Sequence, residues 1–234
     1  RTSFMIGGSL DLASTKVTDY LENEVVETTT TYSYDYNEHY NLAKTANTNS
    51  LGETVETKYY YPLDSEMSGK TLRDSLIHKN MVGMPLVVQS FNGTEKTSEV
   101  ETVYKYWNNA LLAPEIVKTS NGAVAAEDRI KYTAVDPANG NPIEVQQIAG
   151  IPITYIWGYN KTQPIAKIEN ASYSQIQQYV DNLQTLSNTP NNEANLLSAL
   201  DNLRDNLPNA MVTTYTYIPL VGVRTITDYK ANRI

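Results

Sequence analysis

The sequence predicts a mainly β protein: an antiparallel array of β-hairpins, resembling a ribbon, into which an α-helical hairpin is inserted. Three observations lead to this fold class. Apolar and aromatic residues alternate with polar residues along most segments, which is the period of a strand with one packed face. Aromatic residues recur at a nearly constant spacing. One stretch, residues 172–208, has its apolar residues at helical spacing instead.

Composition limits the classes of partner. The 234 residues include 18 Tyr and 2 Trp against 2 Phe, a supply that suits strands with one packed face and ends in water. A net charge of −8 offers no attraction to phosphate backbones or anionic lipids, so we expect no nucleic-acid partner and no membrane insertion. There is no cysteine, and no apolar run approaches the ~20 residues of a transmembrane helix.

The N-terminal part predicts a series of strands that alternate with period 2. In its second strand Thr28, Thr30, Tyr32 and Tyr34 share one face. The predicted elements, in order, are a hairpin of Ser14–Leu21 and Val25–Tyr36 turned at Glu22-Asn23, a return strand Asn41–Ala46, a turn Asn49–Gly52, and a strand Thr54–Tyr61 stopped by Pro62.

The middle of the chain interrupts this pattern once and then resumes it. Leu72, Leu76 and Ile77 predict a short helix within Ser68–Asn80, with Ser68 as its N-cap. The elements that follow are strands Met84–Phe91 and Glu99–Trp107 around an Asn92-Gly93 turn, strands Pro114–Ser120 and Ala125–Tyr132 around Asn121-Gly122, a turn Asp136–Gly140, and a strand Pro142–Ile148.

The stretch Ile151–Ile168 is the clearest copy of the repeating unit. A strand carrying Ile151, Ile153, Tyr155 and Trp157 on one face leads into a turn at Gly158–Lys161, and a second strand leaves from Pro164. The aromatic anchors are spaced 27 residues (Tyr34 to Tyr61), 26 (Tyr106 to Tyr132) and 25 (Tyr132 to Trp157), and return strands begin at Pro85, Pro114, Pro142 and Pro164. Self-similarity at this period predicts an array of hairpins.

Residues 172–208 predict a helical hairpin. Ser172 and Gln175 form a candidate capping box. The apolar residues at helical spacing are Ile176, Tyr179, Val180, Leu183 and Leu186 before a loop at Ser187–Asn192, and Leu196, Leu200, Leu203 and Leu207 before Pro208. Strand alternation resumes at Met211, so we divide the chain into hairpin repeats (1–171), a helical insertion (172–208) and a returning hairpin (209–234).

Several segments resemble the Tyr-Asp repeats of the Rhs/YD-repeat family of large bacterial surface and secreted proteins. They are Tyr32-Ser-Tyr34-Asp35, Tyr104-Lys-Tyr106, Tyr155-Ile-Trp157-Gly158-Tyr159 and the ending Thr214–Asp228. The resemblance covers Val25–Ile234 apart from the helical insertions. One true Tyr-Asp pair, Tyr34-Asp35, stands in an anchor, and Ala231-Asn-Arg233 replaces the Gly-Arg that often follows in the family.

The resemblance implies a non-enzymatic segment of an extracellular or cell-surface bacterial scaffold. In the family, a ribbon of hairpins winds into a shell that encloses a toxin or displays a C-terminal domain. The implied partners are the rest of the full-length chain, a C-terminal toxin or effector domain, and a surface glycan or protein. The chain starts abruptly at Arg1 with no signal peptide, and a further strand is expected after Ile234, so we expect an excerpt or a processed form.

No catalytic, cofactor-binding or metal-binding residue is predicted, and no cofactor. His39 and His78 lack partners at metal spacing. The acidic residues Glu24, Glu27, Asp35 and Glu38 are interpreted as solvated strand edges and turns, since a paired-carboxylate site needs two carboxyls roughly 5–10 Å apart that sequence cannot show. Asp136–Asn141 hints at a calcium loop, but its ligand spacing is not met and a turn explains every residue.

Two alternatives to a scaffold remain open from the sequence. The Tyr and Trp residues could form a module that binds a carbohydrate or a protein, although packing across strands explains the same pattern. A carbohydrate hydrolase with paired carboxylates is the third hypothesis. The helical hairpin is either a cap over the sheet or a docking surface, and an exposed apolar stripe would favour docking.

Overall fold

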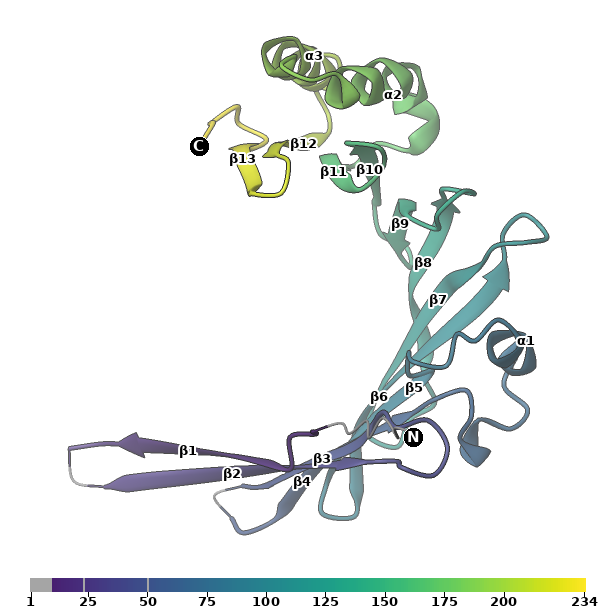
Figure 1. Cartoon of the computed structure of the whole chain (residues 1–234), viewed down its shortest axis with the longest axis vertical. Coiled ribbons are helices and arrows are strands. Elements are labelled where there is room, and N and C mark those ends of the chain that lie inside the picture. Colours follow the sequence, from purple (N-terminus) through teal and green to yellow (C-terminus); the bar gives the residue numbers. More distant parts are fainter. Residues whose placement is uncertain (1–9, 23, 50) are drawn as a thin grey trace, which may run out of the picture. The chain divides into compact units, whose positions relative to one another are not determined.

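The computed structural model describes residues 10–22, 24–49 and 51–234, and it confirms the predicted fold class (Figure 1). The strands form one 13-stranded antiparallel sheet in chain order, so each strand lies beside its neighbours in sequence. The strands are β1 Ser14–Tyr20, β2 Val25–Tyr34, β3 Leu42–Thr48, β4 Thr54–Tyr60, β5 Val87–Asn92, β6 Glu95–Tyr106, β7 Leu112–Asn121, β8 Glu127–Val135, β9 Pro142–Gln147, β10 Pro152–Gly158, β11 Gln163–Glu169, β12 Met211–Ile218 and β13 Gly222–Thr227. The helices are α1 Arg73–His78, α2 Tyr173–Asn188 and α3 Glu193–Asp205, with a 3₁₀ turn at Ser65–Met67.

Contacts along the chain define two compact units. The first contains the described residues up to 103 together with 117–127, and the second contains 104–116 and 128–234. In the first unit, strand β2 has the predicted alternation, since Thr28, Thr30, Tyr32 and Tyr34 are half-buried between exposed residues. Of the predicted Glu22-Asn23 turn, Asn23 lies outside the described residues.

The predicted N-cap of the first helix was wrong. Ser68 does not begin a helix but ends the 3₁₀ turn, where its N–H donates to the carbonyl of Ser65. The next residue, Gly69, has a left-handed φ of 82°, which prevents a helix from starting at Ser68. Helix α1 begins only at Arg73, after Leu72 at φ 60°. Its buried Leu76 keeps the predicted apolar face, because this face packs into the first unit.

The Asn92-Gly93 hairpin forms as predicted, shifted by one residue. Asn92 pairs with Glu95, so Gly93 and Thr94 are the two loop residues. The Asn92 side chain explains the shift: its amide donates to Glu53 Oε2 at 2.8 Å and accepts from Asn49 at 3.3 Å. These bonds hold Asn92 in its strand rather than in the loop.

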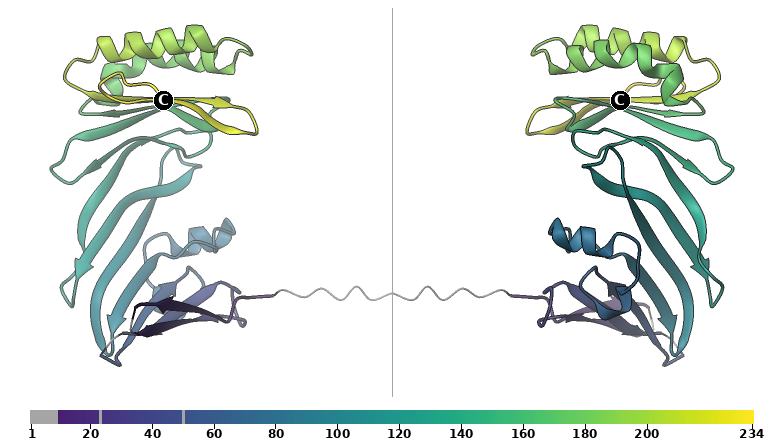
Figure 2. Two further views of the ribbon diagram at one scale, coloured as in Figure 1. Left: turned by 90° about the vertical axis from the view of Figure 1, so that its left-hand side faces the viewer. Right: turned by 90° about the vertical axis from the view of Figure 1, so that its right-hand side faces the viewer.

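In the second unit the two long helices cover one face of β10, β11 and β12 (Figure 2). The capping box of Ser172 and Gln175 is present. Strands β11 and β12 pair directly, so the helical hairpin is inserted between two neighbouring strands. The loop between the two helices is shorter than predicted, because Ser187 and Asn188 still belong to α2.

The hydrophobic core of this unit lies between the helices and the sheet. Its fully buried side chains come from α2, α3 and β10–β12, and they are Ile156, Ile165, Ile168, Ile176, Leu183, Leu196, Leu200, Leu203 and Val212. Among the described residues of α2 and α3, no large apolar side chain is exposed. The helical hairpin is therefore a cap over the sheet. No described helix has both the length and the apolarity to span a membrane.

The face of β10 that packs against the helices is not the aromatic face. Thr154, Ile156 and Gly158 are buried, while the opposite face with Tyr155 and Trp157 is half-exposed. Gly158 is required there because a Cβ would lie 2.5 Å from Ser187 Oγ. The absence of a side chain thus lets the end of α2 approach the strand.

A recurring hydrogen bond explains part of the aromatic period, at Tyr34, Tyr61 and Trp157. At the end of four alternate strands, an aromatic side chain donates to a backbone carbonyl at the start of the preceding strand. We call these bonds anchor bonds: Tyr34 Oη to Leu12 O (3.3 Å), Tyr61 Oη to Leu42 O (3.0 Å), Trp157 Nε1 to Pro142 O (2.8 Å) and Tyr217 Oη to Pro164 O (2.9 Å). Burial raises the pKa of Tyr61 and Tyr217, so both hydroxyls keep the proton that they donate.

The third repeat departs from this arrangement. Here Trp107 Nε1 donates forward, to the carbonyl of Pro114 at 3.3 Å, rather than back to the preceding strand. The Lys105 ammonium lies 3.9 Å from the centre of the Trp107 ring and pairs with Glu115 at 3.0 Å. The cation over the ring and its ion pair hold the indole in place.

We expect the anchor bonds to contribute measurably to stability. Tyr217→Phe removes the hydroxyl donor but keeps the ring, and it should lower the free energy of unfolding by about 0.5–1.5 kcal/mol. Tyr215→Phe, on the same strand and two residues away, is the matched control and should change it by less than about 0.5 kcal/mol. Urea unfolding of the three proteins tests this, and equal stabilities would show that the anchor bond contributes nothing.

Candidate functional site

The two histidines lie in different environments. His78 is the last residue of α1 and is exposed. His39 lies in the turn between β2 and β3, and its side chain is only 1% exposed. It is therefore the buried imidazole of the first unit and the stronger candidate for chemistry.

The fold brings His39 against two carboxylates. Its Nε2 lies 3.0 Å from Asp64 Oδ1 and 3.5 Å from Asp35 Oδ2. Asp35 precedes it by four residues, whereas Asp64 follows by 25 and comes from the loop after β4. Sequence analysis singled out His39 and Asp35 but missed Asp64, because only the pairing of β2, β3 and β4 places the two turns together.

One histidine and two aspartates are a donor set that suits a metal ion, but the imidazole has the wrong tautomer for one. Its Nδ1 accepts the backbone N–H of Asn41 at 3.0 Å, so the proton of the neutral ring is on Nε2, facing the carboxylates. A histidine that binds a metal normally donates from its other ring nitrogen. These residues do not fit a metal site.

The cluster instead fastens two turns together. Asp64 Oδ2 accepts the N–H of Tyr61 at 2.7 Å, and the rings of Tyr61 and His39 are 4.6 Å apart. Asp35 Oδ1 accepts the N–H of Asn37 at 2.7 Å and so orders its own turn. His39 thus connects the turn after β2 with the anchor residue after β4.

Replacing His39 should therefore destabilise the protein without affecting metal binding. His39→Ala removes the donor to Asp64 Oδ1 and the packing of the ring against Tyr61, and it should lower the free energy of unfolding by about 1–3 kcal/mol. His78→Ala, the matched control, should change it by less than about 0.5 kcal/mol. Thermal unfolding with and without Zn²⁺ or Mn²⁺ is the second measurement: a metal-dependent rise in Tm that His39→Ala abolishes would contradict the tautomer assignment.

The other acidic candidates are engaged in turns and ion pairs. Glu27 pairs with Lys16 at 2.8 Å, and Glu24 and Glu38 are exposed. Asp136 Oδ1 accepts the N–H of Ala138 at 2.9 Å, which is the geometry of a turn. Burial opposes ionisation of Asp136, but the Lys161 ammonium at 2.7 Å and the backbone donors outweigh it and lower its pKa.

A second polar cluster ties the C-terminal segment to α3. Both carboxylate oxygens of Asp201 lie 2.8 Å from Arg233 Nη2, and Arg204 reaches Oδ1 at 2.7 Å. Arg233 also donates to Thr227 Oγ1 at 2.8 Å. Partial burial raises the pKa of Asp201, but the two guanidinium groups outweigh it, and the net pKa is lowered.

The lowered pKa of Asp201 predicts an acid-dependent loss of stability. The ionised Asp201 carboxylate contributes fully to the free energy of unfolding above the unfolded-state pKa of about 3.9. This contribution disappears as the pH falls through the lower folded-state pKa. Because the carboxylate is partly exposed, Asp201→Asn should cost only about 0.2–1 kcal/mol at pH 7, and the difference from the unsubstituted protein should shrink below about pH 3. Urea unfolding at both pH values, with Asp181→Asn as control, measures this, and a difference that does not depend on pH would contradict it.

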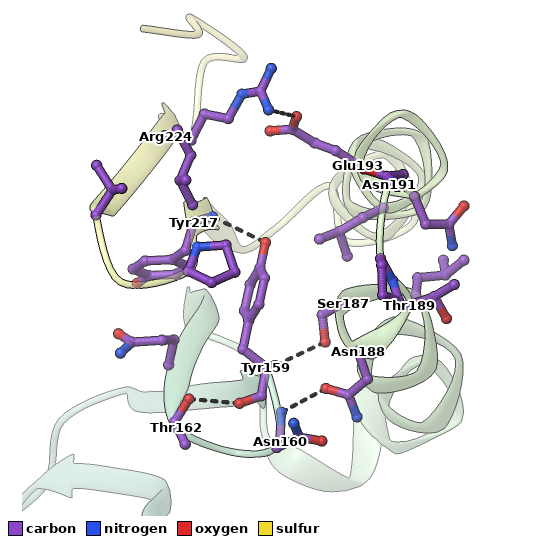
Figure 3. A pocket seen from close by; sticks show the side chains of 18 of the residues that line it. Tyr159, Asn160, Thr162, Ser187, Asn188, Thr189, Asn191, Glu193, Tyr217 and Arg224 are labelled. Carbon is purple, nitrogen blue, oxygen red and sulfur yellow. Dashed lines mark hydrogen bonds and ion pairs between the residues drawn. The ribbon is translucent and has the colours of Figure 1, made fainter.

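The second unit contains a pocket of about 970 Å³ (Figure 3). Three segments form its walls: the turn between β10 and β11, the connection from α2 to α3, and the hairpin between β12 and β13. The Tyr159 ring stands between these walls, and its hydroxyl accepts the N–H of Tyr217 at 3.0 Å. Neither the pocket nor its lining was predicted, because residues of different walls are 21 to 65 positions apart in the sequence.

The turn that forms one wall has an unusual backbone. Tyr159, Asn160 and Lys161 have φ values of 50°, 57° and 61°, three consecutive non-glycine residues in the left-handed region. The end of α2 holds them there, since Ser187 Oγ accepts the N–H of Tyr159 at 3.1 Å and Asn188 Oδ1 accepts that of Asn160 at 2.6 Å. Strain of this kind is typical of functional sites and costs roughly 1–3 kcal/mol per residue.

No family model matches this chain, and no curated protein matches it either.

Proposed function

We propose that this chain is a non-enzymatic segment of the β scaffold of a large bacterial surface or secreted protein of the YD-repeat type, serving encapsulation or display. The observation that carries the proposal is the repeated anchor bond. Four times along the ladder, an aromatic residue at the end of one strand fastens the start of the strand before it. Repetition of one local contact between neighbours is the stabilising principle of repeat proteins.

The turns support the same assignment. Asp35, Asp136 and Asp228 each begin a turn, and in each the carboxylate accepts the N–H two residues further on, at 2.7, 2.9 and 2.9 Å. The aspartate of the Tyr34-Asp35 pair therefore orders a turn, and Asp136 and Asp228 order turns in the same way without a preceding tyrosine. A motif of aromatic anchor followed by a turn-forming carboxylate is what the Tyr-Asp resemblance implies.

Strand pairing also continues past β13. Ile226 and Ile234 exchange two backbone hydrogen bonds, of 3.0 and 2.9 Å, and Thr227 forms a bridge with Arg233. The turn between them is closed by Asp228, whose carboxylate accepts the N–H groups of Lys230 and Asn232. The ladder thus adds its next hairpin in the same way as the earlier ones, which supports an extended array.

Cell fractionation tests the proposed location and role. Antibodies against this chain should label intact cells of the source bacterium or detect the protein in the medium, on a polypeptide well above 26.2 kDa. An antibody against a cytoplasmic protein, which should label only permeabilised cells, is the control. Detection restricted to the cytoplasmic fraction, on a chain of about this size, would overturn the proposal.

A further inference from the structure

We propose that the pocket beneath the helical hairpin binds a neutral oligosaccharide. Ligand binding goes beyond a scaffold role, because it gives a function to a site that the helical insertion helps to form. The pocket lies at one end of the helices α2 and α3, where three chain segments meet (Figure 3). Its volume of about 970 Å³ is that of a site for a small ligand.

The charge of the pocket favours an uncharged ligand. Among the described residues that line it, Arg224 and Glu193 carry the charges, and they pair with each other at 2.9 Å. The second oxygen of Glu193 accepts the hydroxyl of Thr216 at 2.8 Å. Both carboxylate oxygens are therefore already engaged, and the lining as a whole is neutral.

Besides hydroxyl groups such as those of Thr162, Ser187 and Thr189, the remaining polar groups are side-chain amides. Five of them line the pocket: Asn160, Gln163, Asn188, Asn191 and Asn192. Two of the five already use their oxygen within the protein, Asn188 for the N–H of Asn160 and Asn192 for the side chain of Asn195. A carboxamide presents N–H donors and an acceptor oxygen side by side, which matches two neighbouring hydroxyls of a sugar ring. An array of amides with no net charge suits a ligand that carries many hydroxyl groups.

Apolar surface stands next to these amides. The Tyr159 ring lines the pocket edge-on to the Tyr217 ring, with their centres 5.4 Å apart. Leu220 and Val221, between β12 and β13, also line the pocket and are 108% and 78% exposed. A pyranose has one face of C–H groups and a rim of hydroxyls, so it uses an apolar wall and amides together.

The pocket is fixed before any ligand arrives. Tyr159 is held through its N–H by Ser187, through its carbonyl by Thr162 at 2.6 Å, and through its hydroxyl by Tyr217. The three left-handed residues of this turn are thereby kept in one conformation. A site held this rigidly loses little conformational entropy when it binds a ligand.

Titration with defined sugars tests the proposal. The probes are cellohexaose, laminarihexaose, maltohexaose and chitohexaose, each added to the isotopically labelled chain, with binding followed by NMR. At least one hexaose should give saturable shifts of Tyr159, Gln163 and Val221. Gln163→Ala removes one amide from the wall and should weaken this binding about fivefold, the loss expected for one hydrogen bond.

The control variant is Gln147→Ala, an exposed glutamine of β9 outside the pocket, which should leave the affinity unchanged. Three results would overturn the proposal: no hexaose shifts the pocket residues, the shifts map to the Tyr155 and Trp157 face instead, or Gln163→Ala binds as well as the unsubstituted chain. Tighter binding of an uncharged hexapeptide than of any hexaose would also overturn it and would assign the pocket to a peptide.

Discussion

The structure depends on one constraint. A sheet that has no hydrophobic core on at least one of its faces needs other contacts to fix the ends of its strands. The anchor bonds meet this constraint. Tyr34, Tyr61, Trp157 and Tyr217 each place a ring at the end of a strand and donate to the carbonyl that starts the preceding strand. A tyrosine or tryptophan is needed for this, because phenylalanine offers the same ring without a donor. Three of the 18 tyrosines meet that requirement.

The two units add different contacts to the anchor bonds. In the second unit the helices add a buried core over β10–β12, with Ile165, Ile168, Leu200 and Val212 fully buried. In the first unit, polar connections supplement a smaller buried group around Leu76, and His39 joins two turns through Asp35 and Asp64. A histidine with two aspartates resembles a metal site in composition, yet the N–H of Asn41 fixes the tautomer and makes it a structural link.

The helical insertion supplies both the core and the pocket. Its apolar side is covered by the sheet, so the insertion offers no apolar docking stripe among its described residues. Its ends instead reach the neighbouring turns: Ser187 and Asn188 hold the turn after β10, and Glu193 holds the hairpin after β12. An insertion between two paired strands can therefore create a concave site that the repeats themselves lack.

The sequence by itself determined the elements whose signals are local. Period-2 alternation predicted the strands, and apolar spacing and the Ser172–Gln175 capping box predicted the helical hairpin. The aromatic period predicted three of the anchors, Tyr34, Tyr61 and Trp157. Local signals failed where a neighbour decided the outcome. Gly69 moved the start of α1 away from Ser68, and bonds to Glu53 and Asn49 moved the Asn92 turn by one residue. Tertiary structure alone decided which face of β10 is buried, that Asp64 meets His39, and that three distant turns enclose a pocket. Each of these depends on strand register and on contacts between residues far apart in the chain, and no periodic pattern in the sequence encodes them.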